Sequence, residues 1–198
     1  MSPVPRTPFV RTLLVVLALV FVGEILLGGS TRLDVLVRMG ALEPNLVANG
    51  QYWRVLTCAF LHVGLFHLLL NSWALYQLGS LFEIWMGSLP TAAVYFGSAL
   101  GGSLASLTFT RSISAGASGA VFGLLGALIA VLLRRRDRLR PQARSLLIQL
   151  SIWAGINILF GLSTPGIDNA AHMGGLVVGS LIGVRLKTRD ERRRETIF

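Results

Sequence analysis

Apolar residues occur in six long runs that are separated by shorter polar segments. A helix that crosses a bilayer needs about 20 mostly apolar residues, and each run approaches that length. With their connections the runs occupy nearly the whole chain, so the pattern predicts one all-α membrane domain over residues 1–198. The predicted helices cover approximately residues 9–27, 63–85, 91–109, 116–133, 145–162 and 169–186.

The polar connections differ in length and charge. The segment between the first two helices is too long for a turn and too polar to span, which favours a loop lying partly in the membrane interface. Residues 87–90 and 163–168 contain glycine and proline and are predicted to be turns. The first run follows Arg6 and Arg11 as a signal peptide would, but no clear Ala-x-Ala site follows, so we expect a retained helix.

Composition agrees with lipid as the surrounding solvent. Apolar residues make up 53% of the chain and charged residues only 14%, against roughly a quarter charged in soluble domains. The net charge of +9 lies in short basic blocks between apolar runs, which is typical of loops that set membrane orientation. We therefore expect the basic residues to interact with the lipid bilayer and not with nucleic acid. Cys58 is the only cysteine, so no internal disulfide is possible.

The basic residues also predict the orientation in a cell membrane. With six helices, both termini and the loop after the fourth helix share one side, including the basic tail at 187–198. That side holds fourteen of the 18 lysines and arginines, and the opposite side holds four. Since basic loops stay in the cytoplasm, both termini are predicted to be cytoplasmic. The second, fourth and sixth helices then start on the non-cytoplasmic side.

Polar side chains cluster near the outer ends of those three helices. His67 and Asn71 lie in the first turns of the second helix, Ser118 opens the fourth, and His172 lies near the start of the sixth. At a rise of about 1.5 Å per residue, each lies within roughly 10 Å of the outer end of its helix. Taken singly, each is better explained by hydrogen bonds between helices. Together at one depth, they indicate a functional site that opens outward.

A serine between small residues adds chemistry to this cluster. Ser118 stands in the sequence Gly116-Ala117-Ser118-Gly119, directly before an apolar helix. The N-terminus of a helix offers unpaired N–H groups and a positive dipole end, which suit a developing oxyanion. Small residues at four-residue spacing then predict that the fourth and sixth helices pack closely. These residues are Gly119, Gly123 and Ala127 on the fourth helix and Gly175, Gly179 and Gly183 on the sixth.

Three separated motifs resemble those of the rhomboid family of intramembrane serine proteases. The first is a His-x4-His-x3-Asn pattern, the second a Gly-x-Ser-Gly segment with a glycine-rich continuation, and the third an Ala-His-x-Gly-Gly segment. They occur in the family's order, and a Trp-Arg pair precedes them. The matching residues are Trp53, Arg54, His62, His67, Asn71, Glu83, Gly87, Gly116, Ser118, Gly119, Gly123, His172, Gly174 and Gly175.

The resemblance implies a six-transmembrane-helix bundle that hydrolyses peptide bonds with a Ser-His dyad and no cofactor or metal. Ser118 is the implied nucleophile and His172 the implied general base. Substrates are implied to be other transmembrane proteins, cut near the outer leaflet after a small residue, while the oligomeric state stays open. The implied supporting residues are His67 and Asn71 as oxyanion donors, with Gly116, Gly119 and Phe122, whose ring is implied to stack on the histidine.

Several alternatives remain beside this interpretation. A non-proteolytic relative that binds membrane proteins would usually lack the serine or the histidine. A transporter would be expected to contain internal repeats, and a zinc protease would be expected to contain His-Glu-x-x-His, which is absent. Asp168 is interpreted as a helix-start residue, although assistance to His172 stays open. His62 is interpreted as structural, with a role in orienting the site also open.

Overall fold

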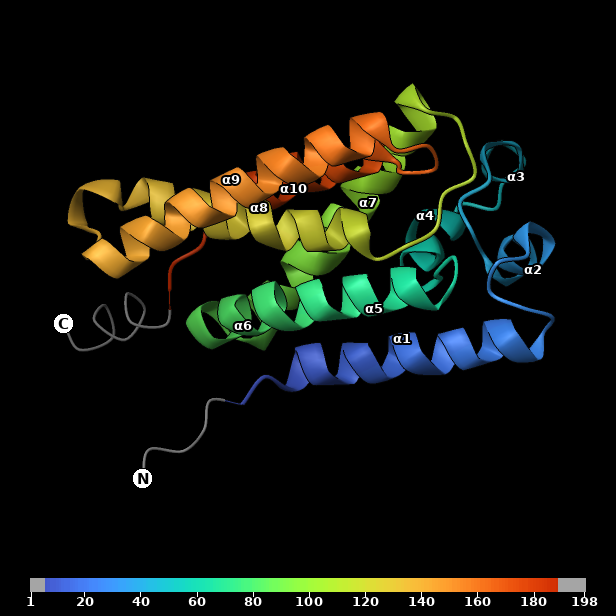
Figure 1. The fold of residues 1–198 in the computed structure, drawn as a ribbon, viewed down its shortest axis with the longest axis horizontal. Coiled ribbons are helices and arrows are strands. Elements are labelled where there is room, and N and C mark those ends of the chain that lie inside the picture. Colours follow the sequence, from blue (N-terminus) through green and yellow to red (C-terminus); the bar gives the residue numbers. More distant parts are fainter. Residues whose placement is uncertain (1–5, 189–198) are drawn as a thin grey trace.

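The computed structural model describes residues 6–188, and these form helices together with one isolated β-bridge between Leu42 and Ser114. The prediction of an all-α protein is therefore confirmed. Figure 1 shows the long helices side by side, with the short helices α2, α3 and α4 at one end and the connection from α8 to α9 at the other. The long helices are α1 (Pro8–Leu26), α7 (Ser88–Phe109), α8 (Ser118–Arg134), α9 (Pro141–Ser163) and α10 (Asn169–Gly183), and a further helical stretch is made of α5 (Leu65–Ala74), the π-helical η2 (Leu75–Gly79) and α6 (Ser80–Met86).

The lengths of these helices bear on how many cross a membrane. By length and composition α1, α7 and α9 could each span, and Arg54–Phe60 with Leu65–Met86 makes a pair bent by 94° that could count as a fourth span. Helix α8 is apolar but shorter, and α10 is shorter still. The count of six spans therefore stays a prediction.

The segment between α1 and α5 is folded into short helices, where the sequence led us to expect a loop. These are α2 (Leu33–Met39), α3 (Pro44–Ala48), α4 (Arg54–Thr57) and the 3-10 turn η1 (Cys58–Phe60). Local capping explains α3, because the Glu43 side chain accepts from the backbone N–H groups of Asn45 and Leu46 and Pro44 stands at the first helical position. Such capping needs no apolar periodicity, which is why the apolar pattern does not reveal these helices.

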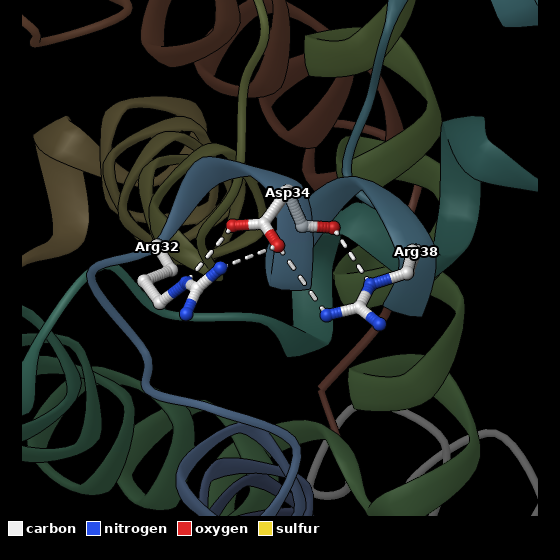
Figure 2. A network of polar contacts seen from close by, with 3 residues as sticks. All are labelled: Arg32, Asp34 and Arg38. Atoms are coloured by element: carbon white, nitrogen blue, oxygen red, sulfur yellow. Dashed lines mark hydrogen bonds and ion pairs between the residues drawn. The ribbon is translucent and has the colours of Figure 1, made fainter.

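An ion-pair network lies on the exposed face of α2 (Figure 2). Asp34 accepts from Arg32 at 3.0 and 3.1 Å and from Arg38 at 3.4 Å. The Arg32 guanidinium holds the pKa of the Asp34 carboxyl below its usual range. All three side chains are more than half exposed, so solvent screens the network and its contribution to stability is small.

The buried guanidinium of Arg54 holds the same segment together from inside. It donates to the carbonyl oxygens of Val37 and Ala41 at 2.7 and 2.8 Å and to Gln51 at 2.7 Å, and it lies 4.6 Å from the Trp53 ring centroid. Because these partners come from separate turns of the segment, one side chain fixes the end of α2 against α4.

Three helix boundaries differ from the predicted ones by three or four residues. Helix α9 starts at Pro141, four residues before the predicted start at residue 145, because proline is favoured at the first helical position. Helix α7 starts at Ser88, where residues 87–90 were predicted to be a turn. Pro90 is tolerated there because the first four N–H groups of a helix need no intrahelical acceptor, and Gly87 makes the break with a φ of 98°. Helix α10 ends at Gly183, three residues before the predicted end. Most of the predicted basic tail, residues 189–198, lies outside the described residues.

Helices α7, α8 and α10 pack against one another through small residues. A Cβ atom added at Gly183 would lie 2.7 Å from Ala127 Cα, and one at Gly102 would lie 2.8 Å from the Ala171 carbonyl oxygen. The helices can approach this closely only because the glycines have no side chain at the contact. The prediction that the fourth and sixth helices pack closely is therefore confirmed.

A buried carboxylate joins α1 to the α6–α7 corner. Glu83 is fully buried, and its two oxygens accept from the backbone N–H groups of Phe9 and Val10 and from the Ser88 hydroxyl, at 2.7 to 3.0 Å. The N–H groups of Phe9 and Val10 belong to the first turn of α1 and lack intrahelical acceptors. Glu83 thus fixes the start of α1 at the end of the bundle opposite α2.

Candidate active site

Ser118 is the first residue of α8, at the end of the bundle where α2 and α4 lie (Figure 1). The Gly116 N–H donates to the Cys58 carbonyl at 2.9 Å, which anchors the approach to the helix. Ala117 is fully buried and Ser118 half-buried. The hydroxyl therefore stands at a helix N-terminus, where backbone N–H groups remain free for a ligand.

Gly116 separates Ser118 from the ring of His67. A Cβ atom at Gly116 would lie 2.7 and 2.9 Å from His67 Cε1 and Nε2, and 3.8 Å from Ser118 Oγ. The φ of Gly116 is 139°, a conformation that residues with a side chain rarely adopt. Both the space and the backbone thus require glycine, and His67 approaches the serine across it.

The orientation of His67 follows from its hydrogen bond. Its Nδ1 accepts from the Val63 backbone N–H at 3.2 Å. In a neutral imidazole the other nitrogen then carries the proton, so Nε2–H is a donor on the side of Gly116 and Ser118. Asn71 is buried one turn later, and its amide nitrogen donates to the His67 carbonyl at 3.0 Å.

His172 lies in the first turns of α10 with its ring stacked on Phe122 of α8. The two ring centroids are 4.2 Å apart and the planes differ by 7°. Phe122 is four residues after Ser118, so it lies on the same face of α8 one turn away. The stack therefore holds the imidazole beside the face of α8 that carries the serine.

Asp168 caps α10 and ties it to α7. One carboxylate oxygen accepts from the Ala171 N–H at 3.0 Å and from the Thr110 hydroxyl at 3.2 Å, and the other accepts from the Ser106 hydroxyl at 2.5 Å. This geometry agrees with the interpretation of Asp168 as a helix-start residue. The His172 Nδ1 is buried and has no hydrogen-bond partner among the described residues.

Backbone contacts bring the helices of Ser118 and His172 together. A Cβ atom at Gly119 would lie 3.3 Å from the Ala171 carbonyl oxygen, so the residues that follow the serine and precede the histidine touch. Among residues 6–188 no hydrogen bond joins the Ser118 hydroxyl to His172. The structure thus brings Ser118, His67, Phe122 and His172 close together, with the serine and histidine side chains not hydrogen-bonded in this conformation. The Asn71 amide nitrogen donates within its own helix, and no hydrogen bond among residues 6–188 links it to Ser118.

Ser118 also borders a small hollow between α7, α8 and the start of α10. Small side chains form most of its wall, and Cys58 Sγ lies 3.3 Å from Ser103 Oγ in it. The hollow therefore suits a small group placed next to the serine. Its lining consists of Cys58, Ala59, Ala99, Gly102, Ser103, Ser114, Gly116, Ser118, Gly119, Ala120 and Ala171.

Two further residues belong to the surroundings of the site. His62 is fully buried, its ring meets that of His67 edge-on at 5.2 Å, and its Nε2 accepts from the Ala117 N–H at 3.5 Å. Glu24 of α1 accepts from the His62 N–H at 2.9 Å. Glu24 belongs to none of the motifs, and the signal that could have revealed it is a carboxylate inside an otherwise apolar run.

Comparisons with known proteins agree with these motifs. The model of the Rhomboid domain matches residues 49–189. The chain is 42% identical over 152 residues to "Rhomboid protease GluP" of Bacillus subtilis, which covers 77% of this chain and 29% of that protein. It is 41% identical over 160 residues to "RHOMBOID-like protein 1" of Arabidopsis thaliana, covering 80% and 40%.

A third relative is "Rhomboid-like protease 1" of Toxoplasma gondii, which is 36% identical over 154 residues, covering 76% of this chain and 53% of that protein. The chain thus spans between about three tenths and a little over half of the length of these relatives. The domain match covers more than half of the chain and contains every motif described above. On this evidence the chain belongs to the rhomboid family.

Proposed function

We propose that this chain is an intramembrane serine endopeptidase that cleaves transmembrane segments of other membrane proteins. The observation that carries the proposal is the position of the Ser118 hydroxyl at the start of α8. The ring of His67 lies next to it across Gly116, and the same face of α8 carries Phe122, on which the His172 ring stacks. The relatives in Bacillus subtilis and Toxoplasma gondii that are named proteases support the same activity.

The proposed reaction uses a dyad. The Ser118 oxygen attacks the scissile carbonyl carbon while His172 takes the hydroxyl proton. His172 then gives that proton to the leaving amine, the peptide C–N bond breaks, and an acyl-enzyme remains on Ser118. Water, deprotonated by His172, releases the carboxylic product. A rotation of the serine side chain toward His172 would make the hydrogen bond that starts this sequence.

The negative charge that develops on the carbonyl oxygen needs donors. The Ser118 backbone N–H, the Nε2–H of His67 and the amide of Asn71 are the proposed ones. The Val63–His67 hydrogen bond supports the role of His67, because it leaves the proton on the nitrogen near Ser118. Losing one such donor typically lowers the rate about 10²–10³-fold.

The proposed setting is a single membrane domain with cytoplasmic termini and a site that opens to the non-cytoplasmic side. Helices α5, α8 and α10 start at the end of the bundle that carries α2 and α4, as this topology requires (Figure 1). Substrates would be cut near the outer leaflet. The small side chains around the hollow beside Ser118 support a small residue before the cut bond.

Covalent labelling tests the proposal directly. A fluorophosphonate probe should label the purified protein at Ser118, as mapped by mass spectrometry, and Ser118→Ala should abolish both labelling and cleavage of a transmembrane substrate. His172→Ala should prevent labelling as well. Ser151→Ala is the matched control, because the exposed Ser151 hydroxyl donates to the Leu147 carbonyl within α9, outside the site, so both measurements should stay unchanged. Full cleavage by Ser118→Ala would overturn the proposal, and a folded wild type without labelling or cleavage would favour a non-proteolytic binder.

A further inference from the structure

Glu24 is a fully buried carboxylate in the last turn of α1. Its Oε1 accepts from the backbone N–H of His62 at 2.9 Å, and its Oε2 is buried with no hydrogen-bond partner among the described residues. A carboxyl group without full hydrogen bonding is costly in an apolar environment. An apolar residue would fill the same buried position at lower cost, so the presence of an acceptor there needs an explanation.

The turn that Glu24 binds leads directly to His67. Two consecutive N–H groups leave this turn toward side chains, since His62 donates to Glu24 and Val63 donates to His67 Nδ1 at 3.2 Å. The Gly64 N–H closes the turn on the His62 carbonyl at 3.0 Å. A single turn therefore carries the hydrogen bond to α1 at one residue and the hydrogen bond that orients His67 at the next.

The side chain of His62 extends the same link to the serine. Its ring packs edge-on against His67 at 5.2 Å, and its Nε2 accepts from the N–H of Ala117, the residue before Ser118, at 3.5 Å. Movement of the His62 backbone would shift both of these contacts. The position of His67 and the backbone entering α8 thus share one support.

We propose that Glu24 is a positioning residue for the oxyanion side of the site, acting through the His62–Val63 turn on His67. The inference rests on the proposed function, because it assigns Glu24 to the same reaction. Glu24 touches no reacting atom. Its effect is to hold the Nε2–H of His67 at a fixed place beside Ser118, and loss of the acceptor lets the turn and the imidazole move.

Substitutions at Glu24 separate positioning from packing. Glu24→Gln keeps a carbonyl oxygen for the His62 N–H, so its kcat should stay within about threefold of wild type. Glu24→Met keeps the length of the side chain and removes the acceptor. Its kcat should fall about 10–10²-fold with KM nearly unchanged. Misplacing an oxyanion donor should lower the rate less than deleting it, which typically costs about 10²–10³-fold.

Glu83→Met is the matched control for general destabilisation. Glu83 is also a fully buried carboxylate that binds backbone N–H groups of another segment, at the other end of α1. Both variants should lower the thermal unfolding temperature. Only Glu24→Met should lower kcat per folded molecule, and an equal loss of kcat in Glu83→Met would overturn the inference.

A double variant shows whether the effect passes through His67. In a His67→Ala background, Glu24→Met should lower the rate of cleavage or of probe labelling by clearly less than it does alone, because the donor it positions is gone and only the long 3.5 Å contact of His62 with the Ala117 N–H remains. A full additional loss would mean that Glu24 acts by another route. Wild-type kcat in Glu24→Met would refute the inference while leaving the proposed function intact, whereas an inactive wild type would refute the function.

A spectroscopic measurement is independent of turnover. In the ¹⁵N spectrum of the imidazoles, wild type and Glu24→Gln should have His67 protonated at Nε2, as the Val63 hydrogen bond requires. Glu24→Met should give a His67 spectrum averaged between the two tautomers. An unchanged His67 spectrum in Glu24→Met would contradict the proposed positioning whether or not a substrate is known.

Discussion

Substituting Gly175 by alanine tests whether the contact between α8 and α10 sets the geometry of the site. Gly175 is buried in α10, three residues after His172, and faces the backbone of Gly119 in α8. The new Cβ atom would lie 2.7 Å from the Gly119 carbonyl carbon and closer still to its oxygen. No side chain can rotate away, because both partners of this contact are backbone.

The size of the effect follows from that overlap. Non-bonded carbon atoms rest about 3.5–4.0 Å apart, so a carbon at 2.7 Å from Gly119 forces the helices apart by about 1 Å. Overpacking of this kind typically costs about 1–3 kcal/mol of stability. A displacement of about 1 Å between reacting groups can lower a rate about 10²-fold. We therefore expect Gly175→Ala to remain folded at moderate temperature and to lose about 10²-fold in kcat.

The assay pairs thermal unfolding in detergent with cleavage of a transmembrane substrate and with the rate of probe labelling at Ser118. Gly155→Ala is the control, because Gly155 lies in α9 with nothing within 4 Å of the added Cβ atom. The control should be neutral or stabilised by up to about 1 kcal/mol, as alanine is the better helix former. Wild-type stability and turnover in Gly175→Ala would refute the reasoning that backbone contact fixes the site.

Three further outcomes are expected. Phe122→Leu removes the ring stacked on His172 at 4.2 Å. Since such pairs contribute about 0.5–1.5 kcal/mol, kcat/KM should fall about 2–10-fold. An unchanged kcat/KM would mean that the stack does not contribute to catalysis. The hydrogen bond from the Leu46 N–H is the chief cause that depresses the pKa of Glu43. The cap that Glu43 makes on α3 is therefore fully present above the ordinary glutamate pKa and is lost as pH falls through the depressed pKa. The hydrogen-exchange protection of α3 should decline in that pH range in wild type and not in Glu43→Gln. A serine mechanism needs no metal, so a zinc chelator should leave cleavage unchanged, and inhibition that added zinc reverses would count against it.

The sequence alone predicts the parts of the site that depend on helix direction and helix packing. Charge bias and apolar runs place Ser118, His67 and His172 near the same ends of their helices, and the structure has all three in the first turns of α5, α8 and α10. The small residues at four-residue spacing predict the α8–α10 contact because periodicity is a property of the sequence. The family motifs add the roles, which spacing cannot supply.

Features that depend on tertiary contacts between irregular segments could not be predicted in this way. Glu24 and the turn at His62 are 38 positions apart in sequence, and no periodicity relates them. Arg54 is similar, since a buried guanidinium that binds the carbonyls of Val37 and Ala41 looks in sequence like a loop charge. The hydrogen-bond partners of Arg54 and Glu24 can therefore be identified only from the folded structure.

Two kinds of contact hold the candidate serine and histidine, and they differ in how far they can yield. The approach of Gly119 to Ala171 is a backbone contact that moves only if a helix moves, whereas the Phe122–His172 stack is a contact of side chains that can change rotamer. Side-chain rotation takes picoseconds to nanoseconds, and helix shifts take microseconds or longer. In the proposed dyad, the Ser118–His172 hydrogen bond would form by a side-chain rotation, which is fast once the helix backbones are in place. It follows that Gly175→Ala must cost more activity than Phe122→Leu, and the reverse order would mean that the stack, and not the helix contact, sets the distance between the two residues.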